Sequence, residues 1–243
     1  MTPSEQEPSK EERRVSAAER VLEHILSEMD AGSLRPGERV NAARIAATLD
    51  LSVAPVREAL SVLSGRGVLD LLPDRGAVMR LLTPDDVVHL WGVLAPVAAK
   101  GLELAAQAIS AGAAIAGLAA AFDRIRDQPL SVKPLAFVLR LNDWHFVANQ
   151  LGGNPFVTRA LEGLGVPYWD RYLVNLIDVH QNIDGYLTNY RRMHEAIVAG
   201  DAHAARAIFH YHAAWSCKLI EQAAEAQRAA RGRKIHVVRQ QGG

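Results

Sequence analysis

Seven arginines between Ala31 and Thr83 are the first residues of this chain whose type and spacing suggest chemistry. A guanidinium group binds DNA phosphates and pairs bidentately with O6 and N7 of guanine, which makes nucleic acid a candidate ligand. Five acidic residues share the segment, so its positive excess is small, and it vanishes in the whole chain, where 27 Lys and Arg balance 27 Asp and Glu. The zero net charge therefore masks where the arginines lie, and it predicts weak non-specific DNA affinity per monomer.

The residues that could support catalysis form none of the common enzyme motifs. The sequence has no G-x-S-x-G, H-E-x-x-H, P-loop or G-x-G-x-x-G pattern, so nothing supplies a nucleophile or a phosphate cradle. Cys217 is the single cysteine, which excludes a cysteine zinc cluster, a CxxC pair and a disulfide within the chain. We therefore expect no enzyme; the alternative is a metal-dependent hydrolase with His145 and His212 as ligands.

Composition and hydropathy indicate the class and compartment of the protein. Hydrophobic residues make up 49% of the chain, which is typical of a globular protein. The first residues, MTPSEQEPSKEERR, are polar, and no later segment is apolar over the roughly 18 residues that a membrane span needs. We expect a cytoplasmic protein with no membrane partner.

The N-terminal third has the pattern of three helices followed by a β-hairpin. Helices are predicted near 16–31, 42–49 and 52–65, and strands over 68–72 and 77–81. Ser52 is expected to cap the third helix, and Pro73-Asp74-Arg75-Gly76 has the composition of a hairpin turn. These elements predict a winged helix-turn-helix, whose last helix enters the major groove of DNA.

The rest of the chain predicts a second, all-α domain. Helical periodicity runs over 85–109, 111–127, 133–151, 155–178, 185–199 and 202–226. Thr83 is expected to cap the first of these helices and to mark the boundary. The predicted fold is mainly α, with a flexible arm at 1–14, the winged helix-turn-helix at 15–82, the all-α domain at 83–227 and a basic flexible tail at 228–243.

Three segments of the N-terminal region carry the most specific sequence: GSLRPGERV, ARIAATLDLSVAPVREALSVLSGRGVL and RGAV. In this order they resemble the DNA-binding domain of the GntR superfamily of transcription factors. The resemblance implies that Arg57 contacts a base or a phosphate, that Ser52 lies near a phosphate, and that Arg75-Gly76 is the tip of the wing. Arg35 and Arg44 complete the predicted DNA-binding set. The sequence departs from the family at Val53-Ala54, where Arg-Thr is more usual, so no standard operator is carried over.

Two segments of the C-terminal half, DWHFVANQLGGNPF and HEAIVAGDAHAAR, resemble the helical effector domain called FCD, found in the FadR-type subgroup of these regulators. The resemblance covers roughly 83–222 and implies a helical bundle that senses a ligand, usually as a homodimer. Leu94 stands where the family commonly has an Arg, which favours a large or apolar ligand over a small anion. A carboxylic acid or an acyl-CoA-like metabolite is the expected effector class.

Many FCD domains hold a divalent metal with one carboxylate and three histidines. In this sequence Leu141 occupies the carboxylate position and Tyr190 one histidine position. His194, one turn beyond Tyr190, could substitute, so that Zn, Ni or Mn would be held by His145, His194 and His212. The alternative is a metal-free pocket in which an organic effector is hydrogen-bonded directly by Asn142, His145, Tyr190, His194 and His212.

The sequence thus predicts a DNA-binding transcriptional regulator. The family resemblance favours a repressor over an activator, because most members repress. Its expected partners are double-stranded operator DNA, a small-molecule effector and a second copy of the chain.

Overall fold

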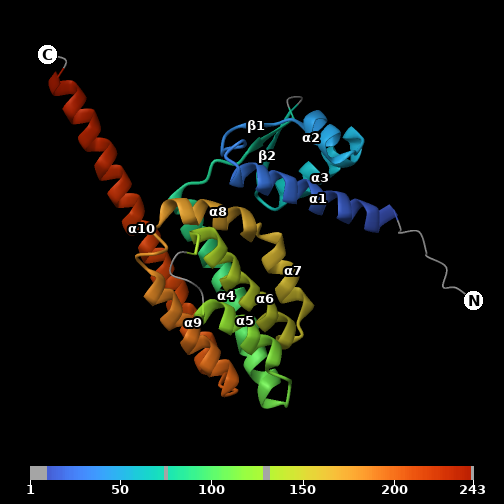
Figure 1. The fold of residues 1–243 in the computed structure, drawn as a ribbon, viewed down its shortest axis with the longest axis vertical. Helices are drawn as coiled ribbons and strands as arrows, with labels where there is room; N and C mark the ends of the chain where they lie inside the picture. Colours follow the sequence, from blue (N-terminus) through green and yellow to red (C-terminus); the bar gives the residue numbers. More distant parts are fainter. Residues whose placement is uncertain (1–9, 74–75, 128–131, 242–243) are drawn as a thin grey trace, which may run out of the picture. The chain divides into compact units, whose positions relative to one another are not determined.

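The structure is a computed structural model that describes residues 10–73, 76–127 and 132–241 of the 243-residue chain. The chain divides between Leu82 and Thr83 into two compact units, which we describe separately. The expected fold class is confirmed, because the first unit combines three helices with a small sheet and the described residues of the second unit form helices and their connections (Figure 1).

The N-terminal unit has the elements of a winged helix-turn-helix. They are α1 (Lys10–Asp30), β1 (Arg39–Val40), α2 (Ala42–Leu49), α3 (Val53–Gly65), β2 (Leu69–Leu72) and β3 (Gly76–Met79). The strands form an antiparallel sheet in the order β1-β3-β2, in which Arg39 lies opposite Val78. The sequence does not predict β1, because two residues are too few for an alternating pattern to show.

The apolar faces of the three helices meet in one core that holds α3 in place. α1 packs on α3. The fully or nearly fully buried side chains include Val21, Ile25, Ile45, Val56, Leu60, Leu63 and Leu69. Each such aliphatic side chain contributes roughly 1.5–3 kcal/mol by burial. Between α2 and α3 the chain turns at Asp50, which adopts the left-handed region at φ 52° and donates its backbone N–H to Ala46 O.

α1 begins earlier than the periodicity alone predicts. Its first turn contains Lys10 and a run of Glu and Arg, which are good helix formers, so the helix starts within the predicted arm at 1–14. The remainder of that arm, residues 1–9, lies outside the described residues.

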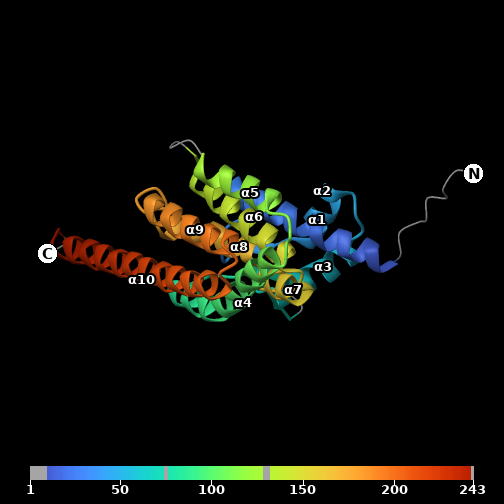
Figure 2. The ribbon, with the colours of Figure 1, turned by 90° about the horizontal axis from the view of Figure 1, so that it is seen from below.

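The C-terminal unit is a bundle built around one long helix. Its elements are α4 (Pro84–Ser110), α5 (Ala116–Arg126), α6 (Pro134–Gly152), α7 (Pro155–Gly163), α8 (Val166–Leu176), α9 (Ile183–Val198) and α10 (Ala202–Gln241). α4 contacts α6, α7, α9 and α10 (Figures 1 and 2). Its N-terminus is fixed by a capping box, in which Thr83 accepts from Asp86 N and Asp86 accepts from Thr83 N, so the predicted cap is confirmed.

Small residues let α4 and α6 approach closely. A Cβ placed on Gly101 of α4 would lie 1.9 Å from Asn149 Oδ1 of α6, and one placed on Gly152 would lie 3.2 Å from Gly101 O. Ala98, Ala105 and their neighbours on α4 are buried. This contact fixes the position of α6, which carries two of the candidate effector residues.

Two predicted segments differ from the structure. The predicted helix over 155–178 is broken into α7 and α8 at Gly165, which adopts φ 64°, a conformation that glycine tolerates without strain. The segment 228–241, which falls in the predicted basic flexible tail, is helical and continues α10, because its Ala-, Arg- and Gln-rich sequence favours helix even without apolar periodicity. Figure 1 shows the last part of α10 extending past the rest of the bundle.

α4 also corrects the expectation that no segment is apolar enough to span a membrane. Among the described residues it is the one helix that qualifies by length and composition, with a hydropathy of 1.3 over an 18-residue window, one third of which is buried. Such a helix is weak evidence for a membrane span, since the core helix of a soluble bundle passes the same test. The contacts of α4 with α6, α7, α8, α9 and α10 agree with the second case.

Candidate functional sites

An open cleft of about 790 Å³ lies in the N-terminal unit between the start of α3 and the small sheet. Arg57 and Val53 of α3 line it four residues apart, on the same side of the helix. Arg39 of β1 lines it as well. Within the described residues neither guanidinium has a hydrogen bond or an ion pair, and both side chains are exposed. Both cations are thus available to an anionic ligand. The sequence prediction included Arg57 and missed Arg39, whose segment carries no recognisable strand pattern.

Arg44 is placed differently from Arg57. It donates two hydrogen bonds to the Glu28 carboxylate of α1, at 2.6 and 2.8 Å, while half of its side chain stays exposed. Such a bidentate pair satisfies the guanidinium within the protein, so a phosphate would have to compete with Glu28 for Arg44. The predicted phosphate contact of Arg44 stays a prediction.

Ser52 occupies the N-cap position of α3 as predicted, but its side chain makes no capping hydrogen bond. The first N–H groups of a helix have no partner within the helix, and they are a ready site for a phosphate together with the exposed Ser52 hydroxyl. Because the capping hydrogen bond is absent, no side chain of the N-cap residue fills the predicted phosphate position.

The remaining predicted DNA-binding residues, Arg35, Gly76 and Arg75, differ in where they lie. Arg35 is exposed, and its backbone N–H donates to Glu38 Oε2 at 2.9 Å. Gly76 lines the cleft and adopts φ 83°, which favours glycine at this end of the hairpin. Arg75 lies outside the described residues.

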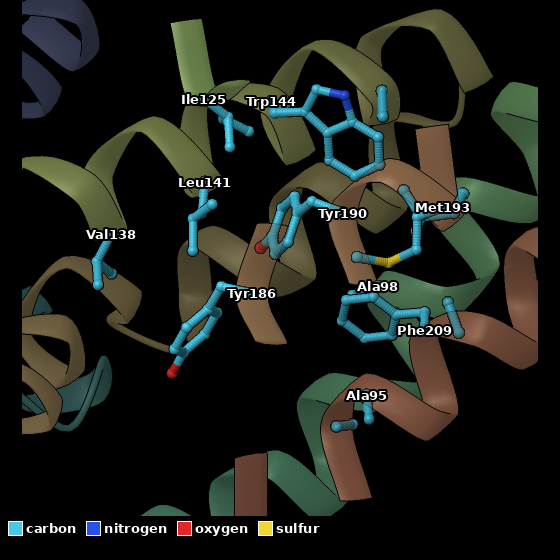
Figure 3. Packing of buried hydrophobic residues seen from close by; sticks show 14 of the residues in the cluster. Ala95, Ala98, Ile125, Val138, Leu141, Trp144, Tyr186, Tyr190, Met193 and Phe209 are labelled. Carbon is cyan, nitrogen blue, oxygen red and sulfur yellow. The ribbon is translucent and has the colours of Figure 1, made fainter. Parts of the chain in front are cut away.

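The second candidate site is a cluster of buried polar and aromatic side chains inside the C-terminal unit. Tyr190 of α9 lies between two histidines, with ring centroids 5.3 Å from His145 of α6 and 5.4 Å from His212 of α10. Figure 3 shows Tyr190 and Tyr186 among Trp144 of α6 and Phe209 of α10. Three of the five predicted effector residues are thus brought together by three different helices.

Both histidines of this cluster are uncharged at neutral pH. Burial, with a smaller contribution from the nearby His212, lowers the pKa of His145 to about 3. Burial alone lowers the pKa of His212 to about 4. His212 Nδ1 lies 3.2 Å from Asn189 Nδ2, whereas the buried His145 Nδ1 has no hydrogen-bond partner. An unpartnered buried nitrogen is costly, so it marks a place where a ligand group would be stabilised.

His194 is directed to other partners. Its ring stacks on Phe122 of α5 at 4.3 Å, and its Nδ1 accepts from Trp144 Nε1 at 3.5 Å. In the described part of the chain no three His, Cys, Asp or Glu side chains lie close enough together to hold a metal ion. The predicted ligand set of His145, His194 and His212 therefore does not converge, and the buried Leu141 supplies no carboxylate. The residues present do not fit a divalent metal.

Asp170 of α8 is a site residue that sequence reasoning missed. Its side chain is buried and accepts a hydrogen bond from Asn142 Nδ2 of α6. Burial raises the pKa of Asp170 to about 7, against the opposing effect of that hydrogen bond. Burial also raises the pKa of Tyr186 and of Tyr190, and the charge of Asp170 adds to both shifts. Helical spacing could have identified Asp170 in the sequence, because it precedes the buried Leu173 by three residues and therefore lies on the apolar side of α8.

Comparison with known proteins identifies both units. Residues 17–79 match the bacterial regulatory proteins of the gntR family, and residues 93–214 match the FCD domain. The Nta operon transcriptional regulator of Aminobacter aminovorans is 36% identical over 73 residues, and the uncharacterized HTH-type transcriptional regulator YdhC of Bacillus subtilis (strain 168) is 32% identical over 73 residues. Each match covers 30% of this chain, and the two cover 35% and 33% of those relatives, about a third of their length.

Solved structures show the same fold over most of the chain. A GntR transcriptional regulator from Rhodococcus sp. RHA1 has a TM-score of 0.66 at 22% identity, covering 86% of this chain and 99% of that one. McbR/YncC of E. coli has a TM-score of 0.65 at 16% identity, covering 85% of this chain and 97% of that one.

A winged helix-turn-helix followed by a helical FCD domain defines a transcriptional regulator. The chain belongs to the GntR family and carries an FCD domain. GntR-family regulators with these domains are not enzymes, so the alternative of a metal-dependent hydrolase has no support from the family matches.

Proposed function

We propose that this regulator is a cytoplasmic, homodimeric repressor whose operator binding is controlled by a small organic effector held, without a metal, in the buried cluster of the C-terminal unit. The observation that carries the proposal is the pair of neutral histidines around Tyr190, one of which has a buried nitrogen with no partner. Such a site offers hydrogen bonds rather than charge.

The effector chemistry follows from what surrounds the cluster. The ring centroid of Trp91 lies 6.1 Å from that of His212, and the ring centroid of Trp215 lies 5.7 Å from it. A mainly apolar surrounding with few polar anchors is typical of a pocket for an organic molecule with a substantial apolar body. His145 and Asn142 are the proposed anchors, and the acyl portion of an acyl-CoA-like metabolite fits this description better than a small anion.

The proposed mechanism is a shift in the population of dimer geometries. A repressor dimer binds two half-sites about one DNA turn apart, so a small change in the separation of the two recognition helices weakens binding. Effector bound among α6, α9 and α10 would favour the geometry that no longer matches the operator. Val93 of α4 is an exposed apolar side chain, 58% accessible, that a dimer interface would cover.

Native mass spectrometry of the purified protein, with elemental analysis of the same sample, tests the effector proposal. We expect a dimer that carries an organic ligand in substoichiometric or stoichiometric amount and no stoichiometric zinc, nickel or manganese. A metal bound at one ion per chain would contradict the metal-free site.

Fluorescence anisotropy with a labelled duplex from the region upstream of the protein's own coding sequence tests the operator proposal. Binding should weaken steeply as salt rises, because arginine–phosphate contacts release counterions. If neither this duplex nor any duplex obtained by selection from random DNA binds in a salt-dependent way, the proposed repressor function is wrong.

A further inference from the structure

We propose that Val53 reads a thymine in each operator half-site through the C5-methyl group of the base, while Arg39 and Arg57 hold the DNA strand at the sides of the same cleft. This inference rests on the proposed operator binding and adds to it the base that the first turn of α3 selects.

The composition of the cleft supports a ligand that is both anionic and partly apolar. Its lining in the described residues contains two arginines and no acidic side chain. Most of the rest is apolar, including Val53 of α3 and Leu71 and Leu72 of β2. A cleft made only for phosphates would be lined by donors, so the apolar part of this lining suits a different contact.

The position of Val53 makes it a base-reading residue. It is the first residue of α3, and the N-terminal residues of a recognition helix are those that reach base edges in the major groove. Its neighbour Ala54 is exposed and small, so it leaves room for close approach. Val is restricted to essentially one χ1 rotamer in a helix, so its two methyl groups are presented at a fixed place.

The chemistry of the major groove identifies thymine as the partner. None of the other three bases offers a methyl group there, and a valine side chain would cover their hydrogen-bonding groups without satisfying them. Thymine alone offers a methyl group, whose contact with Val53 removes apolar surface from water. Loss of one such methyl contact lowers affinity by about fourfold, from roughly 0.8 kcal/mol per buried carbon group.

Arg39 and Arg57 set the register of this contact. Arg39 belongs to β1, which is paired to β3 through Arg39 opposite Val78, so its backbone is held by the sheet rather than by a free loop. Arg57 lies one turn after Val53 on α3. Two guanidiniums that line the same cleft as Val53 and have no partner within the described residues can hold phosphates close to the contacted base.

The experiment replaces thymine by deoxyuridine, which removes only the methyl group. A tight duplex is first obtained by selection from random DNA with the full-length protein, and each thymine of one half-site is then replaced in turn. We expect one position at which deoxyuridine lowers the affinity about fourfold, and we expect Val53→Ala to bind the thymine and deoxyuridine duplexes equally at that position. Val62→Ala, at an exposed site of the same helix outside the cleft lining, is the matched control and should keep the difference.

Arg39→Ala should weaken both duplexes equally and reduce the slope of log affinity against log salt by about one per monomer. The inference is overturned if no thymine position responds to deoxyuridine, or if Val53→Ala keeps the full response. These outcomes differ from failure of the proposed function, in which the wild-type protein would bind no selected duplex at all.

Discussion

The polar side chains of the two candidate sites lie in opposite environments, exposed in the N-terminal unit and buried in the C-terminal unit. In the N-terminal unit Arg39 and Arg57 are exposed and lack partners among the described residues, while Arg44 is paired with Glu28. In the C-terminal unit His145 and His212 are buried and kept uncharged. Exposed cations suit a polyanion, whereas a buried neutral cluster suits a molecule bound by hydrogen bonds and apolar contact. Salt should therefore act mainly on the first unit and acid mainly on the second.

The largest effect on DNA affinity should come from Arg57→Ala. Loss of the charged hydrogen bonds between Arg57 and a phosphate costs roughly 1.5–3 kcal/mol, or about 13- to 150-fold in affinity per half-site. Anisotropy titration of the selected duplex measures it, and the ligand occupancy of the C-terminal unit should not change. If Arg57→Ala binds DNA as the wild type does, the assignment of DNA binding to the exposed arginines of the N-terminal unit is wrong.

Acid should destabilise the C-terminal unit through its histidines. A histidine with an ordinary pKa of 6.5 when unfolded and about 4 when folded binds a proton preferentially in the unfolded state, so stability is lost as pH falls below 6.5. At pH 4 the expected loss for His212 is about 3 kcal/mol. Denaturant unfolding between pH 7 and pH 4 measures this slope.

The variant His212→Leu should reduce that pH dependence by the contribution of His212 and keep the contribution of His145, since leucine binds no proton. His210→Leu, at an exposed position of the same helix, is the control and should leave the slope unchanged. An unaltered slope in His212→Leu would show that His212 is charged in the folded protein.

Asp170 should give a pH effect of the opposite sign. Its folded pKa of about 7 exceeds the ordinary value of 3.8, so the folded state holds a proton that the unfolded state has lost, and stability falls as pH rises from about 4 to 7. The expected amount is about 4 kcal/mol. Asp170→Asn should remove this fall and keep the position of Asn142, which unfolding curves and the near-ultraviolet spectrum measure together. If the pH dependence of stability between 4 and 7 is the same in Asp170→Asn, Asp170 is not buried in the way described.

The smallest effect should follow from Glu28→Gln. The change removes the carboxylate that satisfies Arg44, so a guanidinium becomes available to phosphate, and non-specific DNA affinity should rise a few-fold at low salt. Stability should change by less than about 1 kcal/mol, as for other exposed ion pairs. Unchanged DNA affinity would place Arg44 away from the DNA.

The sequence predicted most of the fold because the signals were local. Thr83 with Asp86 three residues later is a capping box in the sequence as well as in the structure. The break at Gly165 was missed because apolar spacing continues through it, and β1 was missed because a two-residue strand has no period. Both depend on contacts that only the folded chain provides.

The candidate sites were predicted less completely for the same reason. Asn142, His145, Tyr190 and His212 could be named from resemblance, but Asp170 lies on a different helix, and its contact with Asn142 spans 28 residues. His194 was grouped with His212, although its ring stacks on Phe122. Helix spacing shows which residues share a face, whereas the partner that each face meets depends on tertiary packing.

One measurement tests most directly the claim that the N-terminal unit binds DNA and the buried cluster binds the effector. It compares the affinity of three proteins for the selected duplex by anisotropy at two salt concentrations. We expect the wild type and His145→Leu to bind alike with the same steep salt dependence, and Arg57→Ala to bind much more weakly at both concentrations. Loss of DNA binding in His145→Leu, or its retention in Arg57→Ala, would contradict the assignment of DNA binding to the N-terminal unit and of effector binding to the buried cluster.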